Sequence, residues 1–468
     1  MPGAALLSRL ISKLSWIDAK WRFGFVVIVT IVMTVLIQLH VKRVNGPSYW
    51  KWSWRRLDYL PLYPAMLLSA VPFGLAQLHF LRLKQITTRS VVFLMMGTWF
   101  LQLVASGLQQ TPFSLERVWK IVEHPLVTSY YTDAVGFLNR PNLLADYPNL
   151  LSQLHIHSQT KPPGQILYFM FFIRLLGVNQ AASFTGGILI TLLATLAIPG
   201  VLILSRALGL GQKSAFTAAS LMALCPSLIL FSPAFDQVYP AVICLLIAFW
   251  IFSFKKNPIL FSIGLGLILS LILLFSPVLL ISGAIIAALG LTWILEGGDR
   301  RHQLLTLVGN AAIAFGVVLF FYLFLWILTR YNPIELFRNE SIVQAAIQPR
   351  LNRPYSQTVK YDPLDIALGT GWIVVALAIF SLIHFHSTND QPSGVSFYIR
   401  AFCIGQVALL PLSGILRAEN ARVAMFLMPF LMVPAGIELS KWPAKYQAIT
   451  YFCLWFLMVN ICQNMLFF

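Results

Sequence analysis

Charged residues are scarce in this chain: they make up 10% of its 468 residues, whereas a soluble domain usually carries about a quarter. Hydrophobic residues, in contrast, account for 58%. A water-soluble fold cannot bury that much apolar surface, so the composition excludes a soluble protein. It indicates an integral membrane protein that crosses the bilayer many times.

Acidic residues are the scarcer of the charged types, with 16 Asp and Glu against 33 Lys and Arg, which gives a formal net charge of +17. In a soluble chain this excess would suggest a nucleic-acid partner. Here the cations lie in short loops between apolar runs. That placement argues against nucleic acid and favours anionic membrane lipids as the partner of these cations.

Cysteine is also rare, and none of its positions forms a recognisable pattern. All five cysteines lie in apolar segments, without a CxxC pair and without a histidine at ligand spacing. We therefore expect neither a disulfide framework nor a zinc site.

Long apolar runs are what the sequence has in abundance. A spanning helix needs roughly 17 to 25 mostly apolar residues, and by this measure we predict an all-α, polytopic bundle of about 13 transmembrane helices. The predicted spans are 24–39, 60–80, 91–107, 181–204, 214–231, 237–253, 258–275, 278–295, 304–328, 363–384, 397–415, 422–437 and 447–467. The first run ends at His40 and Lys42 rather than at small residues, which predicts a retained helix and not a cleaved signal peptide.

The spans divide the chain into five parts. We predict an N-terminal part, 1–107, with a surface-lying amphipathic helix over 5–17 and three spans; a first extracytoplasmic loop, 108–180, with juxtamembrane helices; a transmembrane core, 181–328; a second extracytoplasmic loop, 329–362; and C-terminal spans, 363–468.

The side of the membrane predicted for each loop depends on a short apolar run, 164–177. We place this run on the membrane surface because it is too short for a span and carries Arg174. The cations at Arg206, Lys213, Lys255 and Lys441 then share one side, which the positive-inside rule makes cytoplasmic. The loop 40–59 falls on the outer side despite its own cations. Its tryptophans, Trp50, Trp52 and Trp54, predict an interfacial aromatic belt.

Titratable residues gather at the predicted outer ends of helices, whereas the predicted spans contain almost none. Three separate regions contribute them: Asp133, Asp146, His155, His157 and Lys161; then Asp236; then Arg417, Glu419 and Arg422. A transporter would instead have inverted repeats, broken helices and charges at mid-membrane. The pattern favours chemistry at one membrane face, although a polytopic transporter stays an alternative.

Residues 158–181, SQTKPPGQILYFMFFIRLLGVNQA, resemble the KPP…G stretch of the GT-C superfamily of membrane glycosyltransferases. This superfamily includes protein O-mannosyltransferases and the aminoarabinose transferase that acts on lipid A. A later run, Arg417-Ala418-Glu419-Asn420-Ala421-Arg422, is similar to the family's RGE..R motif, with Ala418 where glycine is usual. The similarity extends over about 125–250 and 412–430.

The resemblance implies a glycosyltransferase that moves a hexosyl or pentosyl group from a polyprenyl-phosphate donor to an extracytoplasmic acceptor, which is a glycan, a lipid or a protein. It implies a multi-pass protein of the bacterial cytoplasmic (inner) membrane with its active site on the outer face. A lipid-linked polysaccharide polymerase or ligase is a second alternative, since it shares this donor type. Many members carry an acidic pair after the first helix, whereas this chain has a lone Asp133 after three.

Within this scheme, Asp133 is the predicted general base, because an acceptor hydroxyl must lose its proton as it attacks the anomeric carbon. The alternative is a helix N-cap or a loop acid. Lys161 precedes Pro162 and Pro163, which hold it on a stiff segment suited to a phosphate oxygen. The alternative is an interfacial lysine that snorkels. Asp146 is predicted to be a turn residue.

Arg417 and Arg422 are predicted to hold the donor phosphate, and Glu419 is a further predicted substrate-binding residue. Helix anchoring in the headgroup layer is the alternative. Asp236 is either a substrate-binding acid or the N-cap of the following helix.

Tyr131 and His157 complete the predicted substrate-binding residues. Because His155 and His157 alternate, as on one face of an extended segment, a metal pair is one interpretation, but no third ligand is recognisable. The scheme requires no cofactor, although Asp133 with Asp236 could bind a divalent cation. The sequence leaves the oligomeric state open.

Overall fold

The computed structural model describes residues 19–41, 44, 52–54, 63–108, 114–296, 298–347, 349–383 and 397–466. The predicted surface helix over 5–17 and Trp50 lie outside these residues. The described part is almost entirely helical, which confirms the predicted all-α fold. Its two strands, β1 (Ser53–Trp54) and β2 (Met465–Leu466), have two residues each and pair antiparallel.

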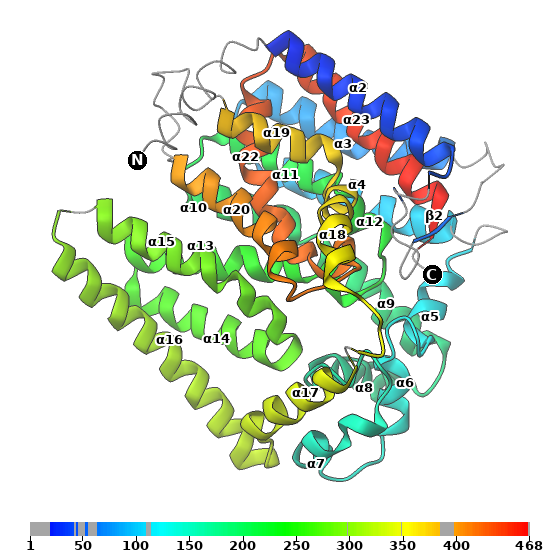
Figure 1. Cartoon of the computed structure of the whole chain (residues 1–468), viewed down its shortest axis with the longest axis vertical. Coiled ribbons are helices and arrows are strands. Elements are labelled where there is room, and N and C mark those ends of the chain that lie inside the picture. Colours follow the sequence, from blue (N-terminus) through cyan, green and yellow to red (C-terminus); the bar gives the residue numbers. More distant parts are fainter. Residues whose placement is uncertain are drawn as a thin grey trace.

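The first and last helices lie side by side (Figure 1). These are α2 (Ala19–Gln38) and α23 (Ala444–Asn464), and Gln38 Nε2 donates to Asn460 Oδ1 at 2.9 Å. The side chains of α2 are apolar on every face and few of them are buried, as expected of a helix that exposes its surface to lipid. Behind it, α3 (Tyr63–Leu83) and α4 (Thr88–Leu108) form a hairpin.

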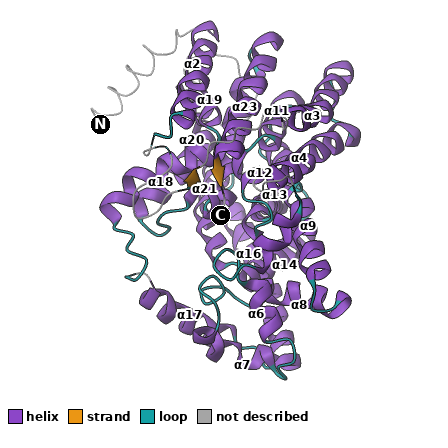
Figure 2. Ribbon diagram, turned by 90° about the vertical axis from the view of Figure 1, so that its right-hand side faces the viewer, coloured by secondary structure: helices purple, strands orange, loops and turns teal. Residues whose placement is uncertain are grey.

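The first long loop folds into short helices that gather at one end of the bundle (Figure 2). They are α5 (Glu116–Glu123), α6 (Tyr130–Gly136), α7 (Leu143–Leu150), η2 (Leu151–Gln153) and α8 (Gly164–Leu176). α8 has 13 residues, fewer than the roughly 17 that a span needs. A Cβ on Gly164 would lie 2.6 Å from the Leu274 carbonyl oxygen. The glycine of the KPPG motif therefore allows α8 to start directly against the end of α14 (Pro258–Phe275).

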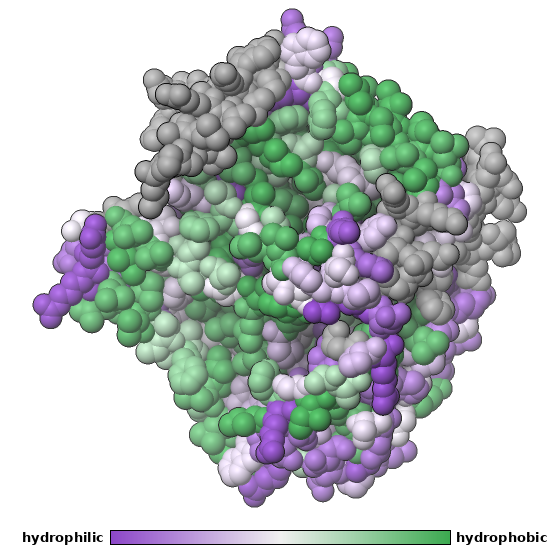
Figure 3. All heavy atoms as spheres, viewed as in Figure 1, coloured by the Kyte–Doolittle hydropathy of each residue, from purple (hydrophilic) through white to green (hydrophobic). Residues whose placement is uncertain are grey.

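The central helices follow in chain order and form the core. They are α9 (Gln180–Ala194), α10 (Ala197–Ala207), α11 (Gln212–Ala223), α12 (Pro226–Leu230), η3 (Phe235–Gln237), α13 (Tyr239–Lys255), α14 (Pro258–Phe275), η4 (Pro277–Ser282), α15 (Gly283–Glu296) and α16 (Arg300–Thr329). α11, α12 and the later helix α22 (Met428–Ser440) are almost wholly buried. α16, in contrast, exposes large apolar residues along its length. Figure 3 shows that apolar residues cover this side of the molecule, which is the expected surface of a protein in lipid.

The last part contains α17 (Pro333–Ile347), α18 (Tyr355–Thr370), α19 (Trp372–Ile383), α20 (Phe397–Ser413), α21 (Asn420–Val423), η6 (Met425–Leu427) and α22 (Met428–Ser440), before α23. The predicted second loop, 329–362, therefore contains a helix of its own, α17, and the first residues of α18. The predicted span 363–384 is not one helix. α18 and α19 meet at an angle of 100°, at Gly371, whose φ of +94° is a conformation that glycine adopts without strain.

Seven helical segments among the described residues are long and apolar enough to cross a membrane, or eight if the bent α18–α19 pair is one span. They are Ala19–Gln38, Thr88–Gly107, Gln180–Ala207, Phe235–Lys255, Pro258–Phe275, Pro277–Leu295 and Arg300–Thr329. Three further predicted spans coincide with shorter apolar helices, and 214–231 is broken between α11 and α12. The chain is thus an integral membrane protein, and the predicted number of 13 spans stays a prediction.

Polar contacts bring several helix ends together at one end of the bundle. Lys255 Nζ donates to the Ala207 carbonyl at 3.3 Å, and the hydroxyls of Ser214 and Ser440 lie 2.8 Å apart. The ends of α10, α13 and α22 and the start of α11 therefore lie together, and these are the ends for which the cation pattern predicts one common side. Which side faces the cytoplasm stays a prediction.

Trp52 does not belong to an interfacial belt, so that prediction is wrong for this residue. Its side chain is only 5% exposed, and its Nε1 donates to Asp365 Oδ1 at 2.8 Å. Trp54 Nε1 donates to the Ile37 carbonyl, and Ser53 pairs with Leu466. The indole N–H groups find partners within the protein, so this part of the first loop is packed against the bundle.

Candidate functional site

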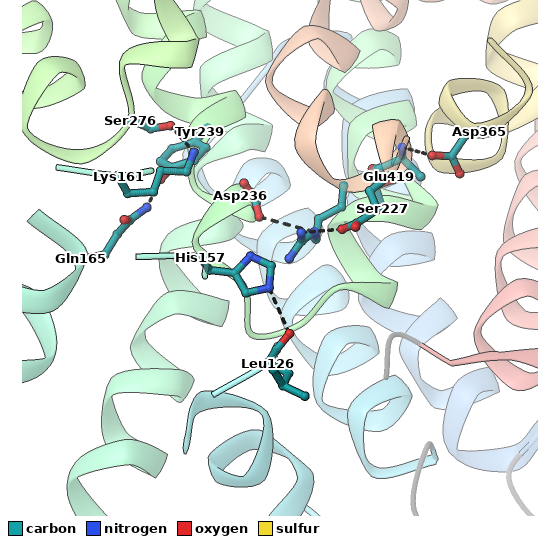
Figure 4. A network of polar contacts seen from close by, with 12 residues as sticks. Leu126, His157, Lys161, Gln165, Ser227, Asp236, Tyr239, Ser276, Asp365 and Glu419 are labelled. Carbon is teal, nitrogen blue, oxygen red and sulfur yellow. Dashed lines mark hydrogen bonds and ion pairs between the residues drawn. The ribbon is translucent and has the colours of Figure 1, made fainter. Parts of the chain in front are cut away.

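Charged side chains from distant parts of the sequence meet beside the short helices of the first loop (Figure 4). We define the charged cluster as Lys161, Asp236, Arg353, Glu419 and Arg422. They come from the loop before α8, from η3, from the loop before α18, and from the loop and first turn of α21.

Glu419 joins two arginines. Its Oε2 accepts from Arg422 Nη2 at 2.6 Å, and its Oε1 accepts from Arg353 Nη2 at 2.5 Å. Burial by itself would raise the pKa of Glu419, but Arg422 and Arg353 outweigh it and hold the pKa at about 2. Because the pKa is depressed on folding, this carboxylate stabilises the fold above its ordinary pKa of about 4.5, and that contribution is lost as the pH falls towards 2.

Asp236 faces the other side of Arg422. Its Oδ2 lies 4.0 Å from Arg422 Nε, and its side chain is 21% exposed, against 10% for Arg422. The N-cap alternative is wrong for this residue, because the N-cap of α13 is Val238 and no side chain caps that helix. The predicted substrate-binding residues Asp236, Glu419 and Arg422 are therefore brought together.

The loop that carries Glu419 is fixed by two acids of α18 that lie three residues apart and so share a helix face. Asp362 Oδ1 accepts from the Ala418 amide at 3.1 Å, and Asp365 Oδ2 accepts from the Ala421 amide at 2.8 Å. Ala418 has a φ of +64° and Glu419 one of +57°. The departure from the family motif at position 418 thus falls on a backbone conformation that favours glycine.

The Arg417 side chain bonds to two backbone carbonyls rather than to Glu419. Its Nε donates to the Gly414 carbonyl at 3.1 Å, and its Nη1 donates to the Arg353 carbonyl at 3.4 Å. The second cation at Glu419 is instead Arg353, which sequence reasoning missed because a lone arginine in a loop carries no signal. Phosphate binding by Arg417 stays a prediction, and Arg353 joins the candidates.

Lys161 points into the protein, where its Nζ donates to Ser276 Oγ at 3.0 Å. The snorkelling alternative does not fit this contact. Burial lowers the pKa of Lys161 and Arg422 lowers it further, whereas Asp236 and Glu340 act in the opposite direction. Lys161 and Arg422 therefore share one carboxylate, Asp236, in their electrostatic surroundings. Beside it, Gln165 Nε2 donates to the Tyr239 hydroxyl at 2.6 Å (Figure 4).

Glu340, on α17, is a further group that the sequence did not single out. Burial raises its pKa to about 7, and Lys161 opposes this rise. Its helix is held to α7, because Asn339 Nδ2 donates to the Pro148 carbonyl at 2.9 Å. A carboxyl group of the second loop thus lies in electrostatic reach of the KPPG lysine.

Asp133 pairs with His155. Its Oδ1 lies 2.7 Å from His155 Nδ1, and both carboxylate oxygens accept from the His155 amide at 3.3 Å. The N-cap alternative is wrong, because Ser129 is the N-cap of α6 and Asp133 bonds outside its own helix.

His155 and His157 do not share one face. The chain turns here, since the amides of Ser158 and Gln159 both donate to the His155 carbonyl. His157 Nε2 bonds instead to the Leu126 carbonyl at 3.0 Å, and its pKa is lowered by burial and by Arg422. The predicted extended segment is therefore wrong, and among the described residues no three metal-ligand side chains come together.

Two other predicted residues lie apart from the charged cluster. The Tyr131 hydroxyl donates to the Asn179 carbonyl at 3.0 Å, and Tyr131 lines a pocket of about 370 Å³ with Glu123 and Thr132. Asp146 lies within α7 rather than in a turn, and pairs with Arg140 at 3.2 Å.

Comparison with known proteins shows similarity in structure but not in sequence. No protein-family model matches the chain, and no curated protein matches its sequence. The structure of ArnT from Cupriavidus metallidurans in the apo state matches with a TM-score of 0.50 and 13% identity, over 77% of this chain and 61% of that chain. The structure of ArnT bound to undecaprenyl phosphate matches with a TM-score of 0.48 and 14% identity, over 78% and 62%.

The chain thus spans about three fifths of the length of ArnT, an aminoarabinose transferase of the GT-C family. At this identity the similarity concerns the fold alone. It confirms the predicted resemblance to GT-C enzymes at the level of the fold.

Proposed function

We propose that this ArnT-like membrane protein is a glycosyltransferase that moves a sugar from a polyprenyl-phosphate donor to an extracytoplasmic acceptor, which is a glycan, a lipid or a protein. The observation that carries the proposal is the charged cluster. In it Arg353 and Arg422 pair with the carboxylates of Glu419 and Asp236, and Lys161 lies within electrostatic reach of Asp236. Three positive charges against two negative ones leave a surplus of one while Glu340, whose pKa burial raises to about 7, is protonated, and this surplus suits a phosphate.

The geometry supports binding of a phosphate that gains charge during the reaction. A sugar phosphodiester carries one negative charge, and the polyprenyl phosphate that departs carries more. Arginine guanidinium groups meet two phosphate oxygens at once and stay charged when buried. Cations held in place before the reaction stabilise the departing phosphate without having to reorganise.

The chemistry is a single displacement that inverts the anomeric carbon. The acceptor oxygen bonds to that carbon while the bond from the carbon to the phosphate oxygen breaks. The acceptor proton passes to the pair formed by Asp133, the predicted base, and His155. The cations can hold one phosphate without a metal, and a divalent ion between Asp133 and Asp236 stays an untested prediction.

The proposal places the cluster on the outer face of the bacterial cytoplasmic membrane, at the end of the bundle opposite Lys255 and Lys441. Two facts support it: the first loop, the second loop and the Glu419 loop all contribute to this end, and the described spans carry few charges. The oligomeric state is left open.

Lipid analysis of a deletion strain tests the function. We expect a polyprenyl-phosphate sugar to accumulate when the gene is absent and to disappear when the wild-type gene is restored. The purified protein in proteoliposomes should form a glycosidic bond between this donor and an acceptor extract. Movement of the lipid or of a solute across the bilayer without a new bond would contradict the proposal and favour a transporter.

A further inference from the structure

Asp133 and His155 form a pair whose two members differ in their access to solvent. Resting on the proposed function, we infer that His155, and not Asp133, takes the proton of the acceptor hydroxyl, while Asp133 holds the His155 ring in position. The inference deepens the proposed function, because it assigns the acceptor side of the same reaction to a residue outside the charged cluster.

Asp133 is poorly placed to touch a substrate. Its side chain is 3% exposed, and its two oxygens already accept from the amide and the ring of His155. Both oxygens are therefore occupied within the protein and do not face an acceptor. The same contacts fix the backbone and the ring of His155 together.

His155 has the properties that Asp133 lacks. Its side chain is 44% exposed. Because Nδ1 faces the Asp133 carboxylate, Nδ1 carries the hydrogen and Nε2 is left with a lone pair. Within the described part of the chain, Nε2 forms no hydrogen bond. A carboxylate that orients a histidine in this way also stabilises the imidazolium that forms when Nε2 accepts a proton.

The pair lies next to the charged cluster along the chain. His157 interacts electrostatically with Arg422, Glu419 and Asp236. It follows His155 by two residues, which span at most about 7 Å. Tyr130 is buried and its pKa is raised by burial and by Asp236 and Asp133. The Tyr130 side chain thus lies within electrostatic reach of both the Asp133–His155 pair and the charged cluster.

The step balances without any further reagent. The acceptor O–H bond breaks and its proton moves to His155 Nε2, while the acceptor oxygen bonds to the anomeric carbon. The bond from that carbon to the phosphate oxygen breaks, and the polyprenyl phosphate leaves with the electron pair. His155, now an imidazolium beside Asp133, returns its proton to water.

The test is the pH dependence of transfer in proteoliposomes at saturating donor. Histidines take up a proton between about pH 5 and 8, so the wild-type rate should fall as the pH is lowered through this range. In His155→Gln the rate should drop by about 10²- to 10⁴-fold, and the residual rate should lack this fall. Asp133→Asn should also lower the rate, because the His155 ring loses the partner that orients it.

Two control variants separate the inference from its alternatives. His157→Gln removes an imidazole from the same loop and should keep the pH-dependent fall, whatever its rate. His302→Gln, on the exposed start of α16, should match the wild type in both rate and pH dependence. The other titratable groups around the pair are Tyr130 and Tyr147, which couple to Asp133.

The outcomes are distinguishable. If the wild type transfers sugar and His155→Gln keeps both the rate and the pH dependence, the inference is wrong and the proposed function stands. If the rate of Asp133→Asn drops while that of His155→Gln does not, Asp133 is the base. If the wild type transfers no sugar from any polyprenyl-phosphate donor, the proposed function fails, and the inference fails with it.

Discussion

The two ends of the bundle both contain an arginine bonded to a glutamate, but the two arrangements differ. At one end, Arg22 bonds to Glu438, whose carboxylate also accepts from Trp442 Nε1 at 2.8 Å. This glutamate is 1% exposed. At the other end, Glu419 accepts from two arginines, and Asp236 and Lys161 stand beside them, partly open to solvent.

The difference shows what each arrangement does. The Glu438 carboxylate is already bonded to Arg22 of α2 and to Trp442, just beyond the end of α22. The contact therefore holds α2 against α22. The charged cluster has a surplus of positive charge and partial exposure, so it can accept an anion. A buried ion pair is therefore a site only where charge and access remain for a ligand.

Labelling of single cysteines is the all-or-none test of the two ends. Cysteines placed in 108–180, position 178 included, should react with an impermeant reagent from outside the cell. Cysteines at positions 255 and 256 should react only after the membrane is opened. Labelling of position 178 from the cytoplasm alone would contradict the assignment, because α8 would then have to cross the bilayer.

Asp133→Asn should give the largest loss of activity while leaving the protein folded in the membrane. An amide keeps the size of the side chain but neither accepts a proton at neutral pH nor holds the His155 ring with a charge. We expect transfer to fall by about 10²- to 10⁴-fold, measured in proteoliposomes. Near-normal transfer would mean that Asp133 neither takes the proton nor positions His155.

Glu438→Gln should affect stability rather than chemistry. The amide leaves the charge of Arg22 without a carboxylate in a buried place, which costs about 3 to 5 kcal/mol in comparable pairs. Thermal unfolding in detergent measures this loss. The matched control is Glu116→Gln, which removes an exposed pair with Lys120 and should change stability by no more than about 0.5 kcal/mol.

Arg422→Lys should weaken donor binding, because a point charge cannot replace a planar group that meets two oxygens. The loss of one such contact, about 1.5 to 3 kcal/mol, lowers donor affinity roughly tenfold to hundredfold. Arg353→Lys should act in the same direction. The control is Arg22→Lys at the opposite end, which should leave the donor dependence unchanged. If all three variants behave alike, the cluster does not bind the donor.

Ala418→Gly should have the smallest effect. A left-handed conformation costs a residue with a Cβ about 1 to 2 kcal/mol, and glycine removes this cost. Glycine also gives the unfolded chain more conformational entropy, which offsets part of the gain in stability. We expect stability to rise by less than about 1 kcal/mol with transfer retained, as seen by the unfolding temperature. Ala421→Gly, within α21, should lower it instead.

The composition and the charge pattern allowed much of this fold to be predicted. Lipid demands continuous apolar runs with their backbone groups paired internally, so class, helical content and most span positions follow from the sequence. The same constraint confines charge to helix ends, which is why Lys161, Asp236, Glu419 and Arg422 were recognisable as candidates. The motif departure at Ala418 was also visible, but not its backbone conformation.

Contacts between distant residues decided the rest. Trp52 and Asp365 are 313 residues apart in the chain, and so nothing local distinguishes a buried tryptophan from one in an interfacial belt. Arg353 and Arg417 look alike in sequence, but only Arg353 reaches Glu419. The sequence determined that this is a helical membrane protein whose titratable residues gather at helix ends, because lipid excludes charged residues from each span separately. Only the tertiary structure decided which charges meet, since that depends on how far-apart helices pack.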